Sequence, residues 1–201
     1  PHQPFDLDHW FTPAALDTEP FEVIEQAQTS VKFRKAFNLV NYSGTKFNVQ
    51  IDREVRLLSD EEVSKNLKLP HLSGQKAVGF ESINKLTNVG VQAWTKQTGL
   101  LSLWILGQFQ ASPNATIAIP IHQGPVSELG EPVNSDYFGT IPTDRLLTKP
   151  NMIYFKADAR YRSKVGINPL RATGILGSYD AQNNLLTLVQ CTPPKGKPEY
   201  V

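Results

Sequence analysis

The sequence predicts a mostly β protein, folded as one antiparallel β-sandwich domain over residues 1–201. Short apolar runs alternate with polar residues at period two, which is typical of half-buried strands. Glycine and proline separate these runs at fairly even spacing, and proline alone makes up 15 of the 201 residues, more than the usual ~5%. A convincing helix start occurs at one place, Ser59.

The first part of the chain predicts three strands and a helix. Residues 21–25 and 31–39 form a first pair, and residues 47–57 form a long third strand whose apolar and charged residues alternate. Ser59 and Glu62 have the spacing of a capping box, so a short helix is expected near 59–67.

The rest of the chain predicts further strands. They are expected at residues 77–87, 99–109, 116–121, 152–155, 164–167, 174–179 and 185–190, with 180–184 as a hairpin loop. Residues 99–109 are apolar on both faces, which favours a central strand covered on both sides, with Trp104 in the core. Residues 123–151 lack periodicity and form either a binding loop or an ordered excursion.

Charge and length exclude several classes of protein. There are 20 Lys and Arg residues against 19 Asp and Glu residues. Binding of nucleic acid needs an excess of clustered cations, and the net charge of the chain shows no such excess. The sequence contains no apolar run of the ~18 residues that a membrane span requires. We therefore expect neither a nucleic-acid partner nor a membrane span.

The acidic beginning of the chain is the first candidate ligand site. Asp6, Asp8, His9 and Trp10 could form a polar cleft wall in which the indole stacks on a sugar ring and the carboxylates accept its hydroxyl hydrogens. The alternative is a solvated strand with a half-buried tryptophan. No cofactor or metal site is expected, although oxygen ligands from Asp6, Asp8, Asp17 or Glu19 would suit Ca²⁺.

Cations collect later in the sequence and form the second candidate site. The residues proposed to bind a ligand are Arg145, Lys156, Arg160 and Arg162, in a stretch that also contains Lys149, Lys164 and Arg171. They could pair with an anionic ligand such as a uronic acid, a sulfated sugar or a phosphate. Alternatively, they neutralise the acidic beginning of the chain.

The sequence gives little support for nucleophilic catalysis or nucleotide binding. The sequence has no G-x-S-x-G elbow, no G-x-G-x-x-G and no P-loop. Cys191, the single cysteine, is expected to be a small buried apolar residue and not an activated thiolate.

Several strings together carry a family resemblance. They are FDLDHWFTPAA at 5–15, TKQTGLLSLWILG at 95–107, DYFG at 136–139, PTDRL at 142–146, YRSKVG at 161–166 and LGSYD at 176–180. With them the chain resembles, over nearly all its length, an uncharacterised bacterial family common in Bacteroidota and similar in fold to galactose mutarotases.

The resemblance implies a large antiparallel supersandwich, of which this chain is the central part and an internal piece. Folds of this kind bind a sugar in a shallow cleft, and the active enzymes use a His as acid and a Glu as base. The strand at 99–107 has Ser102 and Trp104 where such enzymes carry a His, and Glu199 is the nearest candidate for the Glu. Classical mutarotation is therefore not expected.

Three functions remain open. The leading one is a carbohydrate-interacting protein, binding a sugar or another small molecule, in the periplasm or outside the cell. The second is a sugar-active enzyme, such as an epimerase, lyase or glycoside hydrolase, with a displaced acid/base pair of His9 with Glu19 or Asp144. The third is a non-catalytic structural module.

Overall fold

The computed structural model describes residues 11–69, 74 and 76–192. The chain divides into two compact units, with the boundary between Ile105 and Leu106. Each unit is built around one antiparallel sheet, which confirms the predicted mostly β, antiparallel fold class.

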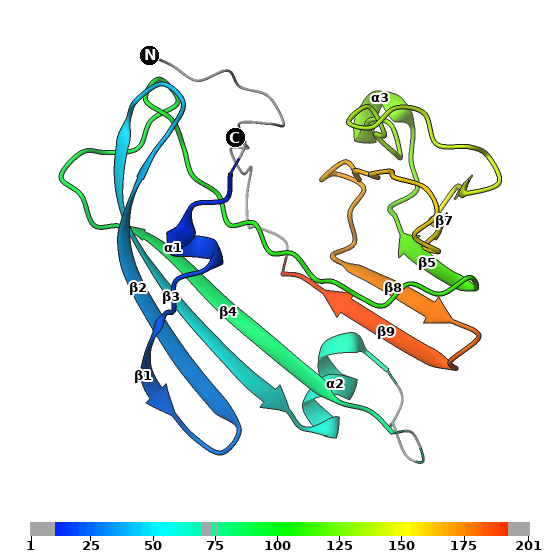
Figure 1. Ribbon diagram of the computed structural model, residues 1–201. Coiled ribbons are helices and arrows are strands. Elements are labelled where there is room, and N and C mark those ends of the chain that lie inside the picture. The colour runs from blue at the N-terminus through cyan, green and yellow to red at the C-terminus, as the bar shows by residue number, and fades with distance from the viewer. Residues whose placement is uncertain (1–10, 70–73, 75, 193–201) are drawn as a thin grey trace. The chain divides into compact units, whose positions relative to one another are not determined.

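The first unit contains a four-stranded sheet in the order β1-β2-β3-β4 (Figure 1). The strands are β1 (Glu22–Gln26), β2 (Ser30–Val40), β3 (Lys46–Leu58) and β4 (Gly79–Asn88), and a short helix, α1 (Ala14–Asp17), precedes them. Every neighbouring pair is antiparallel. The strands predicted from residues 21–25, 31–39, 47–57 and 77–87 are therefore confirmed, with small shifts of their ends.

The buried face of this sheet lies at one end of β3. Phe47 and Val49 are fully buried there, opposite Leu39 and Phe37 of β2. The ring of Trp94 meets Phe47 edge-on, with 5.9 Å between the ring centroids. The alternation predicted from the sequence is thus realised as one buried and one exposed face at this end of the strand.

The opposite face of the same sheet is held by ion pairs between neighbouring strands. Nε of Arg34 lies 2.6 Å from Oδ1 of Asp52, directly across β2 and β3. Arg56 of β3 pairs with Glu81 of β4 and, at 2.7 Å, with Glu62. Opposite charges facing each other across strands add modestly to sheet stability.

The predicted helix is confirmed as α2 (Asp60–Leu67), and Ser59 is its N-cap. The Ser59 hydroxyl accepts a hydrogen bond from the Glu62 backbone N–H at 3.2 Å, and the Ser59 N–H donates to the Glu62 carboxylate at 2.9 Å. This reciprocal pair satisfies two backbone donors at the start of the helix.

The second unit contains a five-stranded antiparallel sheet in the order β6-β7-β5-β8-β9. The elements are β5 (Ala115–Pro120), α3 (Val126–Leu129), β6 (Leu146–Lys149), β7 (Met152–Lys156), β8 (Ile175–Asp180) and β9 (Leu185–Gln190). The predicted hairpin joins β8 and β9. Ile153, the second residue of β7, is fully buried on one face of this sheet.

Two predicted strands are wrong. Residues 100–109 form no strand, and Trp104, expected in the core, is 72% exposed. Residues 164–167 contribute a single bridge, between Gly166 and Asn134, and no strand. Apolar content shows that a segment favours burial, but a strand also needs a neighbouring backbone to receive its hydrogen bonds, and composition does not reveal that neighbour.

Three smaller findings complete the fold. The aperiodic segment 123–151 contains α3 and β6, so part of it is regular. Cys191 is exposed, which corrects the prediction that it is buried: it directly follows β9, whose last two residues, Val189 and Gln190, are exposed as well. Within the described residues, none of the helices has the length and apolar character that crossing a bilayer demands.

Candidate functional site

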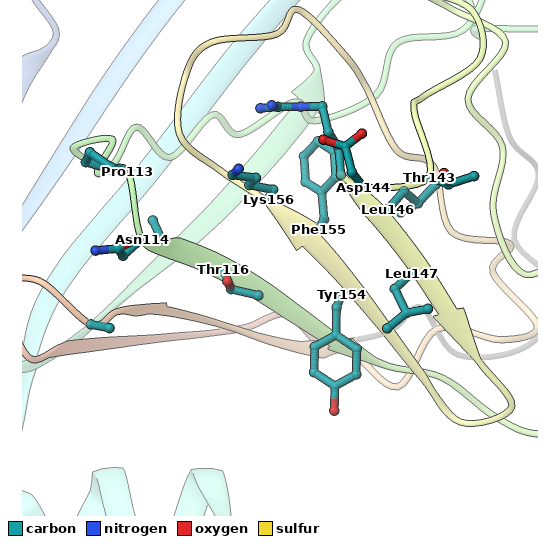
Figure 2. Close-up of a pocket in the computed structure, with 13 residues that line it drawn as sticks. Pro113, Asn114, Thr116, Thr143, Asp144, Leu146, Leu147, Tyr154, Phe155 and Lys156 are labelled. Atoms are coloured by element: carbon teal, nitrogen blue, oxygen red, sulfur yellow. The ribbon is translucent and has the colours of Figure 1, made fainter.

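A cavity of about 440 Å³ opens on the second sheet, and we call it the β5–β7 pocket (Figure 2). It is formed by the beginning of β5, the segment leading into β6, the end of β7 and the loop after β8. Its lining residues are Pro113, Asn114, Ala115, Thr116, Thr143, Asp144, Arg145, Leu146, Leu147, Tyr154, Phe155, Lys156 and Ala181.

Strand register explains why these side chains share one surface. Thr116 of β5 lies directly opposite Lys156 of β7, and Tyr154 of β7 lies opposite Leu147 of β6. Residues directly opposite in an antiparallel pair project from the same face, and residues two apart in a strand do so as well. All four are exposed, whereas Ile153, on the other face, is buried.

An ion pair fixes the charged end of the pocket. Arg145 donates from Nη2 to Oδ1 of Asp158, and the two side chains are only 11% and 4% exposed. The hydrogen bond from Arg145, with a second one from the Arg160 backbone N–H, lowers the pKa of Asp158 to about 2. Asp158 therefore stays ionised at neutral pH and holds the Arg145 guanidinium.

The remaining charges of the pocket are accessible. The Lys156 ammonium lies 3.7 Å from Oδ2 of Asp158, and its side chain is 43% exposed. Asp144 is exposed at the same end of the pocket, and Tyr154 and Leu147 lie toward the other end (Figure 2). The pocket thus combines an exposed aromatic ring with donors and acceptors of hydrogen bonds.

The structure brings together some of the predicted site residues. Asp144, Arg145 and Lys156 line the β5–β7 pocket. Arg160 and Arg162 are exposed and outside its lining, and the guanidinium of Arg162 lies 4.6 Å from the centroid of the Phe138 ring.

The other predicted site residues lie elsewhere. Asp6, Asp8, His9 and Trp10 are outside the described residues, so the cleft proposed from them stays a prediction. Glu19 belongs to the first unit and pairs with Lys35 at 2.9 Å. The proposed acid/base pairs of His9 with Glu19 or Asp144 likewise stay predictions.

The sequence also allowed a second interpretation, in which the cations of residues 145–171 pair with the acidic beginning of the chain. The ion pairs of the described residues bear on this interpretation. Glu19 and Glu25 pair with Lys35 and Lys32, both in β2 of their own unit. In the second unit, Arg145 and Lys156 share Asp158. The acidic and basic partners in these pairs therefore come from within the same unit.

Metal chemistry finds no support in the part of the chain that the structure describes. No group of three or more His, Cys, Asp or Glu side chains within 11–69, 74 and 76–192 is placed to hold an ion. Asp17 and Glu19 are within these ranges, whereas Asp6 and Asp8 are not.

Sequence reasoning missed several of the residues that line the pocket. Asn114, Thr116, Leu147 and Tyr154 were not proposed as site residues, yet all line it. The period-two pattern places Asn114 with Thr116 on one face of the chain, but the register of β5 against β7 is a tertiary property that this pattern does not contain.

Comparisons with known proteins complete the description. No curated protein and no solved structure shows significant similarity to the chain. A model of a family of unknown function, DUF6786, matches residues 1–201. The match covers the whole sequence, and the chain therefore belongs to the DUF6786 family.

Proposed function

We propose that the protein binds a carbohydrate in the β5–β7 pocket. One observation carries the proposal: the exposed ring of Tyr154 shares a single shallow cavity with hydrogen-bonding side chains from separate segments, among them Asn114, Thr116, Asp144 and Lys156. The resemblance of the sequence to mutarotase-like proteins favours the same ligand class and a supersandwich fold.

The chemistry of the lining suits a sugar ring. A pyranose presents an apolar face of C–H groups and an edge of hydroxyl groups, each of which donates and accepts hydrogen bonds. Tyr154 and Leu147 offer apolar surface for the first, while Lys156 donates and Asp144 accepts at the second. Sites of this kind combine an apolar body with a few placed polar groups.

The pocket favours binding over turnover. Asp158, next to the pocket, is ionised and committed to Arg145, so it is not available as a proton donor at neutral pH. Asp144 is the acidic residue of the lining, and the two-carboxylate mechanism of glycoside hydrolysis requires a second carboxyl group beside it. We therefore place non-catalytic binding before a sugar-active enzyme.

Calorimetric titration with a panel of neutral monosaccharides and oligosaccharides tests the proposal. We expect a dissociation constant in the millimolar to micromolar range, because the cavity is shallow and the ligand keeps much of its hydration. Tyr154→Ala should weaken binding about tenfold, since the variant loses the apolar ring surface that the sugar covers, and a stacking contact with an aromatic side chain is worth on the order of 1 kcal/mol.

A matched control distinguishes loss of the pocket residue from loss of any exposed tyrosine. Tyr137→Ala removes another exposed tyrosine, outside the pocket lining, and should leave the affinity unchanged. Equal losses in both variants, or no saturable binding of any sugar by the wild-type protein, would refute the proposal.

A further inference from the structure

A second cavity, of about 630 Å³, lies elsewhere in the same unit. Its lining includes Gly124, Thr148, Lys149 and Arg171, and we call it the Arg171 pocket. None of these residues lines the β5–β7 pocket. The two cavities are therefore separate candidate sites within the second unit.

Arg171 is buried, and its hydrogen-bond partners in the described part of the chain are neutral carbonyl groups. Its residue is 2% exposed. Nε donates to the carbonyl of Gly130 at 2.7 Å, and Nη1 and Nη2 donate at 3.1 Å to the carbonyls of His122 and Gly124. A guanidinium carries five N–H donors. Three of them are used by these bonds to carbonyl groups, and two remain.

The positive charge of Arg171 has no anionic neighbour in contact. Among the residues that the structure describes, no carboxylate oxygen lies within 4.0 Å of the nitrogens of Arg171 or Lys149. Backbone carbonyls solvate a buried cation but leave its net charge uncompensated. Lys149, which is exposed at the end of β6, adds a second cation to the same cavity.

We propose that the Arg171 pocket binds an oxyanion, the carboxylate or phosphate group of a small molecule. Lys149 pairs with the anion directly, and the uncompensated charge of Arg171 at the cavity wall adds to the attraction. The anion supplies the counter-charge that the described protein residues do not provide. This inference is independent of carbohydrate binding in the β5–β7 pocket.

Titration with simple anions tests the proposal. The protein is titrated with sodium phosphate, sodium acetate and sodium glucuronate, each against sodium chloride at equal ionic strength, and heat is measured. We expect saturable binding of at least one of the three. Binding of phosphate alone assigns a phosphate ligand, binding of acetate and glucuronate alone assigns a carboxylate, and binding of neither class overturns the proposal.

Lys149→Gln locates the binding. This exposed residue can change without disturbing the fold, and its loss should weaken anion binding about tenfold, the effect of one charge-assisted hydrogen bond. Lys46→Gln, at an exposed position of β3, is the matched control and should bind as wild type. Equal affinity in wild type and Lys149→Gln overturns the proposal.

Arg171 itself is left unchanged in this test, because its replacement would release three carbonyl groups and confound folding with binding. Tyr154→Ala distinguishes the two proposals. It should reduce sugar binding and leave anion binding intact, so failure of one site does not imply failure of the other.

Discussion

The guanidinium of Arg145 and the carboxylate of Asp158 form an ion pair whose two side chains are almost entirely withdrawn from solvent. Arg145 lies just before β6 and Asp158 just after β7, so the pair joins the two chain segments at one end of the β5–β7 pocket. The Arg145 guanidinium also makes a cation–π contact with the Tyr161 ring, 5.4 Å from the ring centroid, which restrains it further. This end of the pocket is therefore held in place by its own charges.

Stability should depend on pH through Asp158. The pKa of this carboxyl is lowered from 3.8 to about 2 in the folded protein, so its contribution is complete above the unfolded value and is lost as the pH falls from about 4 to about 2. Asp158→Asn should lower the urea midpoint at pH 7, and the difference from wild type should shrink as the pH approaches 2.

Asp17→Asn serves as the control for this series, because Asp17 is an exposed carboxylate of α1. It should leave the midpoint close to that of wild type across the pH range. A difference between wild type and Asp158→Asn that is as large at pH 2 as at pH 7 would contradict the assigned role of the ion pair.

The capping box of α2 gives a second prediction. Ser59→Ala removes the acceptor for the Glu62 N–H and should reduce the free energy of unfolding by about 1 kcal/mol. Ser64→Ala, inside the same helix, should be neutral or slightly stabilising, because alanine has the higher helix propensity. Urea denaturation measures both, and a Ser59→Ala variant as stable as Ser64→Ala would argue against the cap.

Cys191 gives a third prediction. The thiol is exposed and forms no disulfide, so one equivalent per chain should react with a thiol-specific chromogenic reagent in the native protein. Adding denaturant should not increase the number of reacting groups, since the sequence has one cysteine. A thiol that reacts only after unfolding would show that Cys191 is buried.

Much of the fold could be predicted from local sequence patterns. Alternating residues predicted β2 and β3, because successive side chains of a strand point to opposite faces, and the Ser59–Glu62 spacing predicted α2, because the capping contacts join residues three apart. Residues 100–109 failed this reasoning, since apolar content does not specify a pairing partner.

The candidate site was predictable only in part. The charge excess pointed to Arg145 and Lys156, which do line the β5–β7 pocket. Tyr154 and Thr116 join them through the register between β5 and β7, a relationship between segments more than 30 residues apart. In the sequence, Arg171 resembled the other cations. Its burial and its hydrogen bonds to backbone carbonyl groups of residues 122–130 set it apart in the structure.

Chemical-shift mapping by two-dimensional ¹H–¹⁵N NMR tests carbohydrate binding most directly. On titration with a sugar that binds, we predict that the amides of residues 114–116, 144–147 and 154–156 shift progressively, while those of β2 and β3 stay in place. Tyr154→Ala should suppress these shifts. Shifts confined to residues outside the β5–β7 pocket, or no shifts with any sugar of the panel, would contradict the account.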